Sequence, residues 1–96
     1  MYTKDIYDKV IIVIEEEIPL PEGWILGSKT EDATDARCFL CHYLNEAGLS
    51  SAHIQLLTGL CKSAVNRHIA DFQIRVRRRS VTYNWRLQID RRLGIK

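Results

Sequence analysis

Four polar residues close together in the chain have the types and spacing needed to contact the edges of nucleic-acid bases. They are Lys62, Ser63, Asn66 and Arg67, and in a helix this spacing places all four on one side. Asparagine can pair through two hydrogen bonds with adenine and arginine with guanine, whereas serine and lysine can bind either a base or a phosphate. The four side chains are therefore our candidates for base recognition.

The segment that must position these residues is Leu49 to Phe72, which the pattern predicts to be two short helices joined by a tight turn at Gly59. Ser50 or Ser51 is expected to cap the first helix, and the second is expected to begin near Lys62. The predicted inward residues of the first helix are Ile54, Leu57 and Leu56. Those of the second are Val65, Ile69, Phe72 and Val76. An apolar inner side, a sharp turn and an outward polar set indicate a helix-turn-helix, whose second helix lies in the major groove of DNA.

The charge distribution supports a polyanionic partner. Residues 1–35 carry three lysines against nine Asp and Glu, which gives −6, whereas residues 36–96 carry eleven Lys and Arg against three acids, which gives +8. The basic part contains the predicted helix-turn-helix. RNA, an acidic protein or a membrane surface would also suit this charge split. Residues expected to hold phosphates are Ser50 and Ser51 through backbone N–H groups, together with Arg37, Lys29 and the cluster Arg77, Arg78 and Arg79.

The remaining segments are expected to form further helices. Thr3–Glu17 has apolar residues at helical spacing, although its β-branched run from Val10 to Ile14 would also suit a buried strand. Residues 33–47 predict a central, mostly buried helix with Thr30 as its cap and Gly48 at its end. Thr82 to Leu93 predicts a last helix, ended by Gly94. Trp24, Ile25 and Leu26 are expected to form an apolar cluster, after a turn or a Pro-started helical turn at residues 21–23. The expected fold is an all-α bundle of about five helices in a single domain, residues 1–96.

Composition narrows the classes further. The 96 residues are 46% hydrophobic and 27% charged, as in an ordinary globular domain. The longest apolar run, Val10 to Ile14, is too short to cross a bilayer, and the polar start after Met1 is unlike a secretory signal. The expected location is the cytoplasm, with no membrane partner. No phosphate-binding loop of an ATPase is present, and nothing suggests a catalytic cleft, so we expect a binding module without a cofactor and not an enzyme.

The cysteines raise two alternatives. Cys38, Cys41 and His42 match the C-x-x-C-H signature of covalent haem attachment, but the expected compartment and the lack of a methionine beyond Met1 argue against haem. Zinc could use these three residues with Cys61, and His53 or His68 could substitute. A second paired ligand motif is absent, and we interpret Cys38, Cys41 and Cys61 as free thiols, with no bound metal.

A more specific resemblance covers nearly the whole chain. Residues 25–29 (ILGSK), 36–44 (ARCFLCHYL) and 49–54 (LSSAHI) are similar to the C-terminal DNA-binding domain of the bacterial replication initiator DnaA, which has a Trp-repressor-like all-α fold. The resemblance implies that the segment around Ile11 is helical, that duplex DNA is bound through residues 62–72, and that the loop 28–30 approaches phosphate or the minor groove. The family's Arg-Asp-His-Thr-Thr-Val entry to the recognition helix is here Leu60 to Val65, LCKSAV, so a different DNA sequence is expected.

Three hypotheses follow from the sequence, and the third of them is a metal-stabilised module that uses Cys38 and Cys41. The first is sequence-specific binding of double-stranded DNA, in replication initiation or in transcription regulation, by a stand-alone relative of the initiator domain. The second is a protein-interaction adaptor that keeps the fold without DNA binding, which the changed entry sequence and the acidic N-terminal third support. That acidic third could engage a protein partner in either case. The sequence does not give the DNA site, the oligomeric state or the choice between replication and transcription, and it leaves open whether Cys38, Cys41 and Cys61 are free thiols or bind metal.

Overall fold

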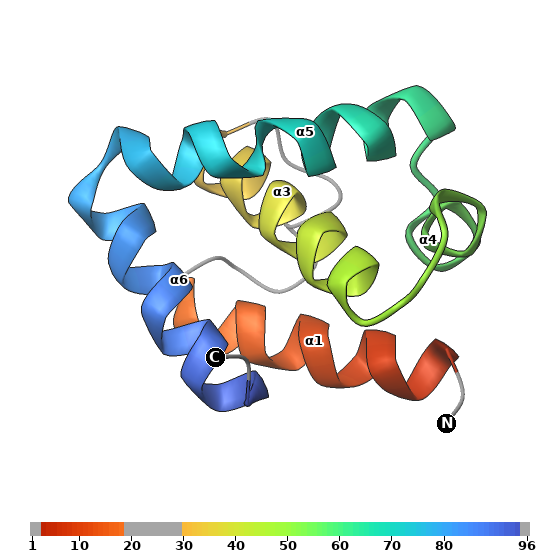
Figure 1. Cartoon of the computed structure of the whole chain (residues 1–96), viewed down its shortest axis with the longest axis horizontal. Helices are drawn as coiled ribbons and strands as arrows, with labels where there is room; N and C mark the ends of the chain where they lie inside the picture. The colour runs from red at the N-terminus through yellow and green to blue at the C-terminus, as the bar shows by residue number, and fades with distance from the viewer. Residues whose placement is uncertain (1–2, 19–29, 95–96) are drawn as a thin grey trace.

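The computed structural model describes residues 3–18 and 30–94, and these residues form five α-helices (Figure 1). The expectation of an all-α chain is confirmed for them. The turn at residues 21–23, the apolar cluster at 24–26 and Lys29 lie outside the described residues.

Helix α1 spans Thr3–Glu17, with the bounds expected from the sequence. Its buried residues are Val10, Val13 and Ile14, a spacing that puts the apolar groups on one helical side. The alternative interpretation of the β-branched run as a strand is therefore wrong, because packing against neighbouring helices outweighs the preference of β-branched residues for strands.

Helix α3, Glu31–Glu46, is the central element that its apolar pattern predicts. The Thr30 side chain caps it by accepting a 3.3 Å hydrogen bond from the Ala33 N–H. Nine of its residues are buried, because α3 packs against α1, α4 and α5. In Figure 1 it lies between α1 and α5, while α4 and α6 lie at opposite ends of the molecule.

Helices α4, Ser51–Thr58, and α5, Lys62–Arg78, are joined by three residues. Gly59 has φ of 78°, a left-handed conformation that glycine adopts without the steric cost of a side chain. The Thr58 hydroxyl, which is buried, donates to the Ile54 carbonyl at 2.7 Å and accepts from the Leu60 N–H at 3.2 Å. These bonds satisfy backbone groups at the helix end and fix the path of the turn.

One predicted core residue of α4 is wrong. Leu56 is 83% exposed, whereas Ile54 is fully buried and Leu57 is half-buried. Residues three and four apart share a helix side, and a residue two positions from Ile54 points away from it. The inward side of α4 is therefore Ile54, Leu57 and the uncharged polar Thr58.

Helix α6 spans Ser80–Leu93 and begins two residues before the predicted start at Thr82. A single extended residue, Arg79, separates it from α5. The fully buried Thr82 hydroxyl lies 2.8 Å from the Arg79 carbonyl oxygen and 3.1 Å from that of Val76, which fixes the angle between the two helices. As expected, Gly94 ends α6 in the left-handed conformation, with φ of 74°.

The core lies where α1, α3, α5 and α6 meet. Phe72 of α5 sits at its centre, with Phe39 at 5.0 Å and Tyr43 at 5.9 Å between ring centroids, both in edge-on geometry. Val65, Val76 and Ile89 are fully buried, and Ile69 packs at the edge of this cluster. In the described part of the chain, no helix combines the length and apolar content that a bilayer crossing requires.

Candidate nucleic-acid interface

The four predicted base-contacting side chains share the outward side of the first two turns of α5. Lys62, Ser63, Asn66 and Arg67 are all exposed. The inward side of the same turns carries Val65, which is fully buried. Because α5 buries one side against α3 and leaves the opposite side open, the polar set is presented to solvent on a firmly packed helix.

Helix α4 meets this surface through its N-terminus. The Ser50 side chain caps α4 by accepting from the His53 N–H at 3.3 Å. The next residue, Ser51, donates its hydroxyl hydrogen to Oδ1 of Asn66 at 2.7 Å. This bond joins two predicted DNA-binding residues that are fifteen positions apart, and it brings the start of α4 beside the second turn of α5.

The predicted phosphate-holding arginines lie elsewhere. Arg77 and Arg78 are exposed in the last turn of α5. They are about 17 Å from Asn66 along the helix axis, at 1.5 Å per residue. A single base pair cannot contact both groups. The structure therefore separates the predicted set into an N-terminal polar group and a C-terminal basic group.

Arg79 is engaged inside the fold. Its guanidinium lies 2.5 Å from Asp35, 3.2 Å from Asp32 and 3.9 Å from Glu31, all in the first turns of α3. Arg75 makes a second 2.7 Å ion pair with Asp35. The Asp35 carboxylate is almost fully buried, and the two arginines neutralise it. The charge pattern assigns Asp35 to the acidic N-terminal third and Arg79 to phosphate binding. The signal in the sequence for a buried Asp35 is its position between Ala33 and Ala36, which are both buried.

Arg37 also makes a contact within the protein. It is half-buried on α3 and donates to the Thr34 hydroxyl at 3.0 Å. Desolvation by burial lowers its pKa, and the neighbouring Arg75 acts in the same direction. Lys29, the other candidate from this region, lies outside the described residues.

The C-x-x-C-H motif faces the core. Cys38 and Cys41 are fully buried, and burial raises the pKa of the Cys38 thiol to about 11 and that of Cys41 to about 12. Cys38 lies 3.4 Å from Nδ1 of His68. The His42 ring stacks on Phe72 with centroids 3.6 Å apart. Across residues 3–18 and 30–94, no three side chains of His, Cys, Asp or Glu are placed to hold a metal ion together.

Cys61 differs from the other two cysteines. It is exposed at the N-cap position of α5, with its sulfur 3.4 Å from the Ser63 hydroxyl. The hydrogen bond with Ser63 and bonds with backbone N–H groups lower the pKa of its thiol. Of the three free thiols, those of Cys38 and Cys41 are therefore buried and that of Cys61 is accessible to solvent.

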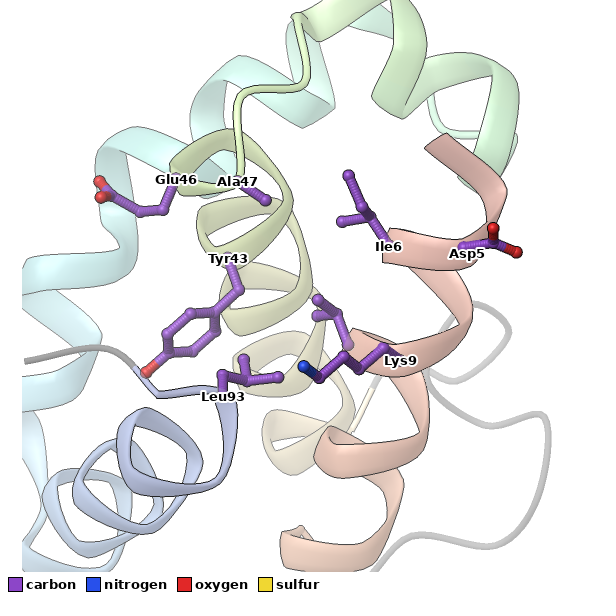
Figure 2. Close-up of a pocket in the computed structure, with 8 residues that line it drawn as sticks. Asp5, Ile6, Lys9, Tyr43, Glu46, Ala47 and Leu93 are labelled. Atoms are coloured by element: carbon purple, nitrogen blue, oxygen red, sulfur yellow. The ribbon is translucent and has the colours of Figure 1, made fainter. Parts of the chain in front are cut away.

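A hollow of about 570 Å³ opens between α1, the end of α3 and the end of α6 (Figure 2). Ile6, Val10, Tyr43 and Leu93 form apolar walls, and Lys9 extends toward Leu93. The Tyr43 hydroxyl is turned to another partner, because it donates to Asp90 at 2.5 Å. None of the predicted DNA-binding residues lines this hollow.

Comparison with known proteins gives no assignment: the chain matches no protein-family model, no curated protein and no solved structure.

Proposed function

We propose that the protein binds double-stranded DNA sequence-specifically, with α4 and α5 acting as a helix-turn-helix and the N-terminal half of α5 lying in the major groove. The observation that carries this proposal is the placement of Lys62, Ser63, Asn66 and Arg67. All four are exposed on one side of two helical turns, opposite a packing side that carries the fully buried Val65. A recognition helix needs this combination of an outward polar set and a rigid support.

The residues divide into two roles in this proposal. Asn66 and Arg67 contact base edges, with Lys62 and Ser63 contacting bases or nearby phosphates. The free backbone N–H groups at the start of α4, beside Ser50 and Ser51, bind a phosphate on the flank of the groove. Arg77 and Arg78 add phosphate contacts at the far end of α5, and Arg37 and Lys29 complete the set predicted from the sequence.

The resemblance to the initiator domain supports a role in replication initiation or transcription regulation. Residues 60–65, LCKSAV, differ from the family's entry to the recognition helix. These residues immediately precede and open α5, where base contacts are made in this class of domain. We therefore propose that the protein reads its own DNA site and not the initiator's.

A salt titration of binding to duplex DNA tests the proposal. If about four to five phosphates are neutralised, log affinity falls with log salt with a slope of roughly −4. The double variant Lys62→Ala/Arg67→Ala should weaken binding and flatten the slope. Arg91→Ala is the matched control, because Arg91 is an exposed arginine on α6, at the opposite end of the molecule from α4. Absence of binding to any duplex at low salt, or equal loss in both variants, would overturn the proposal.

A protein-interaction adaptor is the second candidate, and one observation favours it. Leu56 on α4 and Ile74 on α5 expose 83% and 65% of their surface. Large exposed apolar side chains can mark contacts with another protein. The two functions separate experimentally, because Leu56→Ser should leave DNA affinity unchanged under the DNA-binding proposal and abolish partner binding under the adaptor proposal.

A further inference from the structure

The hydrogen bond between Ser51 and Asn66 has a consequence for base selection. Ser51 is the first residue of α4 and Asn66 is the fifth of α5. The Ser51 hydroxyl donates to Asn66 Oδ1 at 2.7 Å. An amide oxygen has two lone pairs and an amide nitrogen carries two N–H donors. With one lone pair used by Ser51, the Asn66 amide keeps one acceptor and two donors for a partner in the groove.

The orientation of that amide decides which base it can match. In the major groove adenine presents a donor, N6–H, beside an acceptor, N7, whereas guanine presents two acceptors, O6 and N7. An amide whose oxygen and nitrogen are held in a fixed order matches the adenine pair. An amide free to rotate about its last torsion loses this order, because that torsion is broad and the two ends have nearly the same size.

The adjacent residues Ser50 and Ser51 make different side-chain contacts. Ser50 already caps α4 by accepting from the His53 N–H. Ser51 follows the cap, so its hydroxyl is available to the neighbouring helix, while its backbone N–H remains among the free groups at the helix start. A side-chain role for Ser51 is therefore compatible with a phosphate contact through its backbone.

We infer that Ser51 is a positioning residue that holds the Asn66 amide in the order that selects adenine, at the base pair that Asn66 contacts. This inference deepens the proposed function and rests on it. Ser51 acts through Asn66 and does not itself contact the base. The structure thereby assigns one specificity-determining interaction to a pair of side chains from two helices.

The test compares binding to four duplexes that differ only at the base pair assigned to Asn66, which is the pair where Asn66→Ala loses its preference. Ser51→Ala should reduce the preference for adenine about tenfold, within the range that one bidentate contact supplies. Ser51→Thr keeps the hydroxyl and should retain the preference. In the Asn66→Ala background, Ser51→Ala should have no further effect, because its route to the base has been removed.

Ser63→Ala is the matched control, since Ser63 is an exposed serine of the same surface whose contact is with Cys61. Its effect should persist in the Asn66→Ala background. Equal weakening of all four duplexes by Ser51→Ala, or the same loss with and without Asn66, would overturn the inference and leave the DNA-binding proposal standing. Failure of the wild-type protein to bind any duplex would overturn both.

A second measurement needs no DNA. In the free protein, Ser51→Ala should shift the NMR resonances of the Asn66 side-chain NH₂ group, and Ser63→Ala should leave them in place. Unchanged Asn66 resonances in Ser51→Ala would show that the contact is not formed, which also overturns the inference.

Discussion

The two halves of α5 use polar residues in opposite ways. In the first two turns, Lys62 and Arg67 point to solvent. At the other end of the helix, Arg75 makes an ion pair with the buried Asp35, and Arg79, the residue that follows α5, does the same. The surface that we propose for base contacts thus belongs to the N-terminal half of α5, while ion pairs join the C-terminal end of α5 to α3.

This contrast shows that a count of basic residues overstates the charge available to a polyanion. Four arginines lie at the C-terminal end of α5, and two of them, Arg75 and Arg79, are neutralised by carboxylates within the fold. Arg77 and Arg78 are exposed. The +8 of residues 36–96 therefore includes charge that stabilises the protein, and the DNA contacts that we propose use the residues that remain on the surface.

The largest expected effect is on protein stability, through the ion pairs of Asp35 with Arg75 and Arg79. Asp35→Ala should lower the free energy of unfolding by about 3 kcal/mol, because it leaves two arginines without the carboxylate that they surround. Urea denaturation monitored by circular dichroism measures this loss. Asp32→Ala, which removes a partly exposed partner of Arg79, should cost less than about 1 kcal/mol. Equal, small losses of stability in both variants would mean that the ion pairs of Asp35 do not hold the C-terminal half of α5 against α3.

The next effect distinguishes the thiol at the start of α5 from the two buried thiols of α3. At neutral pH Cys61, at the start of α5, should react with an alkylating reagent on the order of 100-fold faster than Cys38 or Cys41, because only the thiolate reacts. Burial raises the pKa of both core thiols, to about 11 and about 12. Mass spectrometry of time-resolved labelling gives the three rates, and labelling in urea should make them similar. Comparable rates in the native protein would show that α3 is not packed as described.

A smaller effect separates base from phosphate contacts. Arg67→Ala should relax the preference at one base pair by about 1–2 kcal/mol, whereas Arg78→Ala should weaken all sequences alike and reduce the salt slope by about one. Selection from a random duplex pool, followed by titration of single-site variants, measures both. Identical behaviour of the two variants would show that the assignment of Arg67 to a base and of Arg78 to a phosphate is wrong.

The smallest effect concerns the start of α4. Ser50→Ala removes the side chain that caps the helix and should cost about 1 kcal/mol of stability. Ser51→Ala, one residue later, should change stability by less than about 0.5 kcal/mol, because its hydrogen bond with Asn66 lies at the protein surface. Thermal unfolding of the two variants compares them directly. The reverse order would place the cap at Ser51.

The helices could be predicted because their signals are local. Thr30, Ser50, Gly59 and Gly94 act through hydrogen bonds or backbone angles within a few residues, and the apolar spacing of α5 reports its buried side. The errors came from tertiary contacts. Leu56 is of a residue type common in protein cores, but the local sequence does not indicate that α4 packs through Ile54 and Thr58.

The candidate site was predictable in part for the same reason. The outward set on α5 follows from helical spacing alone, and its exposure agrees with that expectation. The bond from Ser51 to Asn66 and the ion pairs of Asp35 join residues 15 and 40 or more positions apart. Spacing within one helix carries no information on which side chains of another helix lie opposite, so these contacts required the structure.

The single extended residue between α5 and α6 has a mechanical consequence. The connection is a single residue, Arg79, which also makes ion pairs with the first turns of α3. We therefore expect a tilt or rotation of α5 to move α6 as well. At its other end the three-residue connection to α4 imposes a similar limit. In the proposed complex with DNA, we therefore expect little change in the backbone of α4 and α5. Under the DNA-binding proposal, the fit would then depend on bending of the DNA, at an elastic cost that depends on its sequence.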